Sequence, residues 1–291
     1  MKKSLLMLML LMAVTSLAIV SCTEDESLEE QKIDNVCAKM NDAMLKKYCI
    51  ENYDYNHDGK ISLEEAEFVT EIDIYGEGVY SLAGIEYFPN LRILDCANNN
   101  LTSLDVSKNM NLKILDCWSN DISVLDLSKN TALVDLSCHG TLIKSLDLRN
   151  CKALRDVLCG GNRTLSTLHV SGLSKLEALT CRDSNISNLD LSGCTSLLRL
   201  DCSGNNLTEL NVSKCCSLYQ LMCQENKLTT LDVSSCNLPY AQEMIIPFIP
   251  LDVSPMSTLK TLYLKSGWSL KYINYNRSSS YIPNNAEIVY K

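Results

Sequence analysis

Residues 91–111 read LRILDCANNNLTSLDVSKNMN, and much of the chain repeats this stretch. The same arrangement, LxxLxCxxNxLxxLDVSxNxx, begins again after every 21 residues, with one interval of 22. The units begin at Leu91, Leu112, Leu133, Leu154, Leu176, Leu197 and Leu218. One such unit cannot bury its leucines alone, so neighbouring units must stack and align them into a shared interior. The sequence therefore predicts a stacked, solenoid-type fold.

The unit length and the leucine spacing are those of a leucine-rich repeat. We expect an α/β-type solenoid, a curved rod in which each unit adds one strand to a parallel β-sheet on the concave face. Val69 begins an atypical first unit, and Leu238 and Leu259 begin two late ones. The repeats are thus expected over residues 69–265, with a C-terminal cap at 266–291 that ends in a strand.

Seven cysteines occupy the sixth position of successive units, where a leucine normally points inward. They are Cys96, Cys117, Cys138, Cys159, Cys181, Cys202 and Cys223. A free cysteine packs as a small hydrophobic residue, so we expect a buried ladder of thiols. Disulfides are disfavoured because side chains on neighbouring rungs are parallel. A zinc site is disfavoured because the chain has no CxxC pair and only 3 histidines.

This cysteine-bearing repeat, LxxLxCxxNxLxxLDVS, resembles that of the internalin-like leucine-rich-repeat proteins with a cysteine ladder. The resemblance covers residues 69–265 and implies a bacterial surface protein that acts in adhesion or ligand capture. Enzymatic activity is not expected, because the sequence has no GxSxG, HExxH or phosphate-binding glycine loop. Cys138 and His139 are adjacent on a strand and point to opposite faces.

The N-terminal segment predicts export and a lipid anchor. Residues 1–22 have a basic start, an apolar run too short to span a bilayer, and a small residue before Cys22. This ending resembles a bacterial lipoprotein signal, with Cys22 as the lipidated residue; the alternative is an ordinary signal peptide that releases a secreted protein. Residues 23–30 form an acidic linker. We expect a protein anchored in the outer membrane and facing the cell exterior.

Residues 31–68 are expected to form a helical cap that resembles an EF-hand, with one helix over 29–51 followed by a calcium loop. The predicted ligands are Asp54, Asn56, Asp58, Lys60 through its carbonyl oxygen, Ser62 through water, and Glu65 as a bidentate carboxylate. Gly59 stands at the sharp turn that such a loop requires. Oxygen ligands at alternate positions suit calcium, and the alternative is a polar loop without metal.

The third, fifth and seventh residues of each unit should project from the concave sheet toward solvent. The seventh position carries Tyr75, Trp118, His139 and Arg182, a composition typical of binding hot spots. The fifth position carries Asp73, Asp95 and Asp116 on successive rungs. A recurring asparagine at the ninth position, as in Asn99 and Asn120, is expected to bond backbone groups in the turn.

These features predict a non-catalytic binding or adhesion module that uses the concave face. The alternative is a glycan-capturing surface lipoprotein of a polysaccharide-uptake system, for which Trp118 with Asn98 and Asp116 is the candidate platform. A third possibility is an inert structural spacer. The net charge of −9 makes nucleic acid and anionic membrane surfaces poor partners, so the predicted partner is a protein or a glycan, with membrane contact through the anchor alone.

Overall fold

The computed structural model describes residues 35–238, 251–253, 256–267 and 286–291. The predicted signal segment, Cys22 and the acidic linker lie outside the described residues. Within these ranges no helix is long and apolar enough to cross a bilayer. The described chain is a β-solenoid of about nine turns with few helices.

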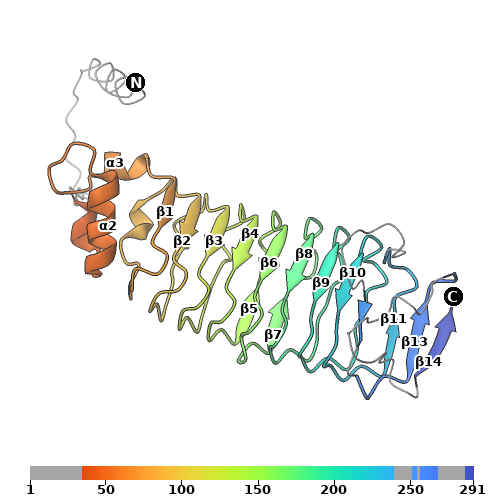
Figure 1. Ribbon diagram of the computed structural model, residues 1–291. Helices are drawn as coiled ribbons and strands as arrows, with labels where there is room; N and C mark the ends of the chain where they lie inside the picture. The colour runs from red at the N-terminus through yellow and green to blue at the C-terminus, as the bar shows by residue number, and fades with distance from the viewer. Residues whose placement is uncertain (1–34, 239–250, 254–255, 268–285) are drawn as a thin grey trace, which may run out of the picture. The chain divides into compact units, whose positions relative to one another are not determined.

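The main sheet contains nine parallel strands stacked side by side, nearly one for each repeat unit (Figure 1). Its strands are β1 (Glu71–Asp73), β2 (Ile93–Asp95), β3 (Ile114–Asp116), β4 (Asp135–Ser137), β6 (Asp156–Leu158), β8 (Ala178–Thr180), β9 (Arg199–Asp201), β10 (Gln220–Met222) and β12 (Leu251–Asp252). Equivalent residues pair throughout, as in Leu94 with Leu115 and Leu115 with Leu136. The leucine spacing therefore predicts the strand register correctly.

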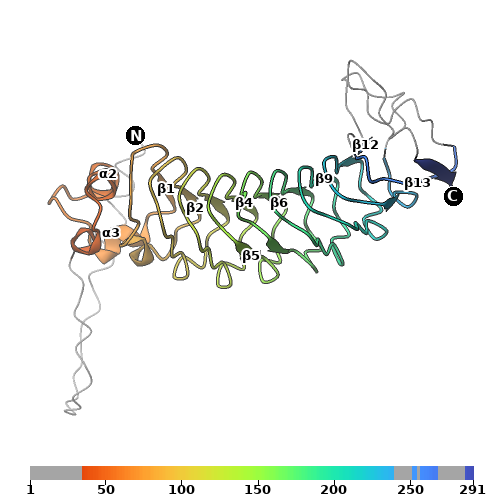
Figure 2. The same cartoon turned by 90° about the horizontal axis from the view of Figure 1, so that it is seen from below.

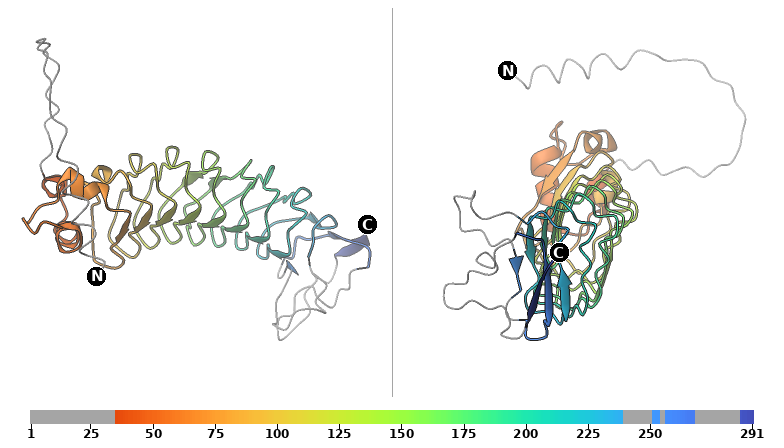
Figure 3. Two further views of the ribbon diagram at one scale, coloured as in Figure 1. Left: turned by 90° about the horizontal axis from the view of Figure 1, so that it is seen from above. Right: turned by 90° about the vertical axis from the view of Figure 1, so that its right-hand side faces the viewer.

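Short strands also form where the chain returns through the LDVS part of the unit. β5 (Ser145–Asp147) pairs with β7 (Thr167–His169), and β11 (Thr230–Asp232) pairs with β13 (Thr261–Leu264), which pairs with β14 (Glu287–Tyr290). Successive turns follow one another along the stack in sequence order (Figure 2). Viewed end-on, the turns overlie one another (Figure 3).

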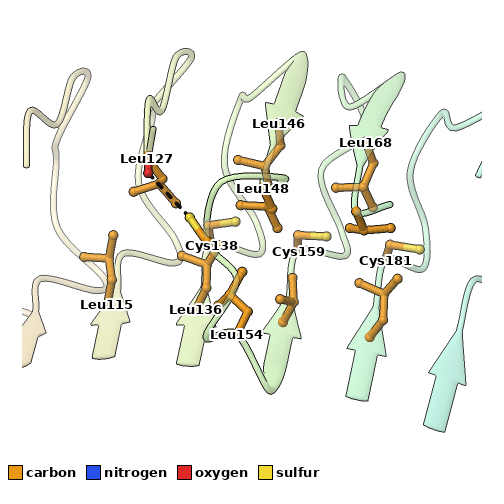
Figure 4. Close-up of a cluster of buried hydrophobic side chains, with 14 of the residues drawn as sticks. Leu115, Leu127, Leu136, Cys138, Leu146, Leu148, Leu154, Cys159, Leu168 and Cys181 are labelled. Atoms are coloured by element: carbon orange, nitrogen blue, oxygen red, sulfur yellow. Dashed lines mark hydrogen bonds between the residues drawn. The ribbon is translucent and has the colours of Figure 1, made fainter. Parts of the chain in front are cut away.

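The interior is a continuous column of leucines with a ladder of sulfur atoms beside it (Figure 4). All seven predicted ladder cysteines are fully buried and free. Burial raises the pKa of Cys138 and Cys181 to about 12, so these thiols stay protonated. The predicted cysteine ladder is confirmed.

A second column of buried polar groups holds the turns together. The side-chain nitrogen Nδ2 of Asn120 donates to the backbone carbonyl oxygens of Cys96 and Cys117. The side-chain oxygen Oδ1 of Asn120 accepts from the backbone amide of Leu101. Each such asparagine thus bonds its own rung and the preceding one, which satisfies buried backbone groups. The structural role predicted for these asparagines is confirmed.

The eighth position of each unit from Val69 to Leu218 lies in a turn with a left-handed backbone. Its residues are Gly76, Asn98, Ser119, Gly140, Gly161, Asp183, Gly204 and Glu225, all with positive φ. Only some of these are glycine, since a left-handed conformation is tolerated by other residues at a cost. The repeat pattern did not predict this left-handed position, because the residue type there varies from unit to unit.

The N-terminal cap contains a 3₁₀ helix, η1 (Val36–Lys39), and two α-helices, α2 (Ala43–Tyr53) and α3 (Leu63–Glu67). A further 3₁₀ helix, η2 (Ile85–Tyr87), lies in the first unit. The expected continuous helix over 29–51 is wrong, because the Asp42 carboxylate accepts from the Met44 and Leu45 amides and starts a new helix there.

The last repeats also depart from the expected spacing. Leu251 pairs with Leu221, 30 residues earlier, so the rungs predicted to start at Leu238 and Leu259 are wrong. Tyr263 consequently lies in β13, beside β11, and not in the main sheet. The expected C-terminal strand is present as β14. Residues 239–250, which follow Leu238, and the aromatic residues at 268–281 of the expected cap lie outside the described residues.

Candidate binding face

The candidate site is the solvent side of the main sheet, here called the front face. It consists of the side chains at the third, fifth and seventh positions of the units, while positions four and six are buried. Because the strands pair in register, each position forms a straight column that crosses the rungs. Neighbouring rungs lie about 4.8 Å apart, so side chains of one column touch their neighbours.

The seventh-position column brings three of the predicted binding residues into one aromatic row. The Trp118 indole stacks on the His139 imidazole, with centroids 5.0 Å apart and planes 10° from parallel. Tyr75 lies on the other side of Trp118, with ring centroids 5.6 Å apart. Trp118 is therefore held between two rings, and Tyr75, which is 49% exposed, ends the row.

Two small residues make this row possible. Ala97 stands between Tyr75 and Trp118 in the column and is fully buried, so the two larger rings meet across it. Gly160 stands between His139 and Arg182, and a Cβ there would come within 2.9 Å of the Arg182 carbonyl oxygen. The composition of the seventh position predicted the four large residues as binding residues. The role of the two small residues was not predicted, although they occupy the same column of the sequence.

Arg182 completes the row at its C-terminal side. Burial lowers the pKa of His139, and the positive charge of Arg182 lowers it further. The Ser137 hydroxyl lies 3.0 Å from Nδ1 of His139 and fixes the orientation of its ring. All four predicted binding residues thus lie in one column, and His139 is neutral there at pH 7.

The fifth-position column carries the acidic part of the front face. Asp73, Asp95 and Asp116 pair across β1, β2 and β3 in direct register. Burial raises the pKa of Asp116, and the charges of Asp95 and Asp135 raise it further. The pKa of Asp95 is raised in the same way by burial and by Asp73, against a hydrogen bond from the Ala97 amide.

Two acidic side chains in the C-terminal half of the main sheet have basic partners. Arg199 lies 3.6 Å from Asp156, and Arg155 forms an ion pair with Glu177. Such exposed pairs contribute little to stability, yet they neutralise the local charge. Asp201, at the fifth position of this half, forms no ion pair among the described residues and accepts hydrogen bonds from the Ser203 amide and hydroxyl. It stands between Thr180 and Met222, whereas the three N-terminal acids of this column are direct neighbours.

The predicted calcium loop connects α2 to α3 and is closed by its own hydrogen bonds. The Asp54 carboxylate accepts from the Asp58 and Gly59 amides. The Glu65 carboxylate accepts from the Tyr55 and Asn56 amides at one oxygen and from Ser62 at the other. Glu65 thus joins the beginning and the end of the loop. The φ of Gly59 is +80°, as the sharp turn requires.

The oxygen donors of this loop fit calcium in type and order. Asp54 and Glu65 are buried, and the loop supplies carboxylate, amide and carbonyl oxygens at alternate positions. Among the described residues, however, no group of three or more His, Cys, Asp or Glu side chains is gathered as a metal site. An ion bound here would compete with the amides that bond the Asp54 and Glu65 carboxylates.

Comparison with solved structures links this geometry to one class of proteins. The functional domain of InlJ from Listeria monocytogenes, which includes a cysteine ladder, matches 80% of this chain at 27% identity with a TM-score of 0.58. Internalin C2 from the same organism matches 88% of this chain and 96% of its own length at 17% identity, with a TM-score of 0.50.

The fold is the internalin-type leucine-rich-repeat solenoid. The chain spans 56% of the InlJ domain that it matches, so that protein's ligands and activity do not transfer as findings. No family model and no curated protein matches the sequence.

Proposed function

We propose that this chain is a non-catalytic surface module for binding or adhesion, and that its ligand contacts the front face around Trp118. The observation that carries the proposal is the row of Tyr75, Trp118, His139 and Arg182, held in place by ring stacking and by an in-register sheet. A preorganised surface loses little entropy on binding, so a few aromatic anchors can dominate affinity. The similarity to an internalin functional domain supports the same class.

A protein ligand is favoured over a glycan by the geometry of Trp118. Sugars stack on an open ring face, but His139 covers one face of Trp118 and Tyr75 lies against the other side. Trp118 therefore presents its edge to a ligand, which suits apolar and hydrogen-bonding groups of a polypeptide. The glycan alternative retains one open aromatic ring, that of Tyr75.

The experiment compares three full-length proteins on the same support: the wild type, Trp118→Ala, and Lys129→Ala as a control on an exposed loop. Each is exposed to cell-surface protein extracts and, separately, to a glycan array. A true ligand should bind the wild type and Lys129→Ala equally and bind Trp118→Ala roughly 30-fold more weakly, the equivalent of about 2 kcal/mol. Equal binding by the wild type and both variants would place the ligand site away from the front face.

Anchoring at the outer membrane, facing outward, is part of the same proposal. It rests on the sequence of residues 1–30, in which the apolar run ends at Cys22 and an acidic linker follows. Cys22→Ala should move the protein from the membrane fraction to the soluble fraction. Unchanged partitioning would contradict lipidation at this residue.

Calcium binding by the N-terminal loop is a further part of the proposal. Asp54, Asn56, Asp58, Lys60, Ser62 and Glu65 would hold the ion, and the ion would neutralise the loop carboxylates. A single loop that packs beside the first rung suits a stabilising clamp, since sensors usually pair two such loops. The ion would then fix the cap that covers the end of the solenoid core.

A further inference from the structure

The N-terminal half of the front face contains acidic side chains without basic partners. Within the described residues, no Lys, Arg or His forms an ion pair with Asp73, Asp95, Asp116 or Asp135. Arg92 and Lys113 directly precede β2 and β3, and neither forms an ion pair with these carboxylates. In the C-terminal half, Asp156 and Glu177 are paired with arginines, and Asp201 is an isolated acid of the fifth-position column, between Thr180 and Met222.

Keeping these carboxylates in register is unfavourable for the isolated protein. Burial and like-charge repulsion raise the pKa of both Asp95 and Asp116. The fold itself does not require acids there, because the same position carries Ser137, Leu158 and Met222 on later rungs. A column of mutually repelling carboxylates that the fold does not need suggests a ligand with positive charges that offset the repulsion.

Apolar side chains border the acidic column on both sides. Tyr75 and Trp118 lie along the seventh position, and the half-buried Ile93 and Ile114 lie along the third. Lysine and arginine have the matching character, because an aliphatic stem carries their charged group. Their stems can cover the apolar borders while their charged groups meet the carboxylates.

We propose that the ligand of the front face is a protein segment with basic side chains at alternate positions, which pair with Asp73, Asp95 and Asp116 beside the edge of Trp118. This inference rests on the proposed function of the same face. The acidic column spans about 9.6 Å, two rung spacings of about 4.8 Å, and alternate side chains of an extended peptide lie about 6.7 Å apart. Two flexible basic side chains therefore reach three carboxylates.

The test measures binding of fluorescently labelled ten-residue peptides to the full chain by anisotropy. One peptide alternates Lys with Ser, a second alternates Arg with Ser, and a third alternates Glu with Ser. The variant protein is Asp95→Asn/Asp116→Asn, which preserves shape and the hydrogen bond at residue 95. The matched control, Asp121→Asn/Glu209→Gln, removes the same number of charges from exposed loop positions.

We expect the Lys and Arg peptides to bind the wild type and the control double variant equally, and the acid-column variant at least about tenfold more weakly. Raising the salt from 0.05 to about 0.5 M should weaken wild-type binding severalfold, because exposed charges are screened. The Glu peptide should not bind. Equal binding of the basic peptides by both double variants, or no binding at low salt, would overturn the inference.

The outcome also separates this inference from the proposed function. If a captured protein or glycan loses affinity with Trp118→Ala but not with the acid-column variant, the front face binds ligands and the basic-segment inference fails. If a captured protein loses affinity with both, both proposals are supported. If no ligand responds to Trp118→Ala while the basic peptides still require Asp95 and Asp116, the acidic column binds independently of the aromatic row.

Discussion

The indole of Trp118 stacks on the imidazole of His139, and the two residues lie two positions beyond the ends of the neighbouring strands β3 and β4. The two residues are 21 positions apart in sequence, one repeat unit, so the contact exists because β3 and β4 pair without slippage. A slip of one residue would send one ring into the core. The geometry of the candidate site is thus a direct product of the leucine spacing that builds the core beneath it.

The pKa of His139 should depend on its burial and on the charge of Arg182. Burial and Arg182 hold its pKa below the ordinary value of 6.5. The stabilisation from its neutral form is therefore present above pH 6.5 and is lost as the pH falls through the lower folded pKa. Arg182→Gln should raise the pKa of His139, measured by NMR titration of the imidazole, whereas the distant Arg163→Gln should not. An unchanged titration in Arg182→Gln would show that its charge does not act on the ring.

Asp116→Asn should stabilise the isolated protein at neutral pH. Burial, Asp95 and Asp135 raise the pKa of Asp116, so its stabilising protonated form is lost as the pH rises through that raised value. Removing the charge should raise the melting temperature at pH 7 by roughly 1–3 °C. The gain should vanish near pH 3, where the wild-type carboxyl is protonated. A lower melting temperature at pH 7 would mean that Asp116 stabilises the fold through contacts that Asn cannot replace.

The regular part of the molecule follows from the sequence because strand alternation fixes the direction of every side chain in a unit. Leucine spacing alone placed Trp118 and His139 in one column and Cys138 in the core. The ring stacking itself depends on side-chain rotamers, and it needs the small Ala97 and Gly160 in the same column. Spacing gives no information on rotamers, so the row was predicted only as a set of neighbours.

The wrong prediction of the last repeats arose because a strand of the main sheet and a returning segment can have the same sequence. Leu251-Asp-Val253 reads as the LDV of a returning segment, and the expected unit at Leu238 placed it there. The structure pairs Leu251 with Leu221 in the main sheet, which moves the following strand to the opposite side. In the cap, the apolar residues on both sides of Asp42 have the spacing of one continuous helix. The Asp42 carboxylate instead caps the first turn of α2, so the segment forms two separate helices, η1 and α2.

The cysteines should divide sharply by reactivity. Among the described cysteines, Cys216 is the exposed one, and the ladder thiols are fully buried. In a Cys22→Ala background, a thiol reagent should modify Cys216 rapidly in the folded protein at pH 8, and Cys216→Ser should remove that reaction. The ladder thiols should react only in denaturant, without prior reduction. If peptide mapping finds the ladder cysteines themselves unlabelled under those conditions, the ladder forms disulfides.

Calcium should stabilise the N-terminal cap, because a ligand that binds only the folded state raises its stability by mass action. Removing calcium with a chelator should lower the melting temperature by roughly 5 °C relative to a concentration near 100 times Kd. Glu65→Ala is an ambiguous variant, since Glu65 also bonds the Tyr55 and Asn56 amides and caps α3. Asp58→Asn still accepts the hydrogen bond from the Lys60 amide but removes one ligand charge, so it should bind calcium more weakly and need a higher calcium concentration for the same stabilisation. Glu64→Gln, a charge change beside the loop, should respond like the wild type. An identical dependence of the melting temperature on calcium concentration in Asp58→Asn and the wild type would show that this loop is not the calcium site.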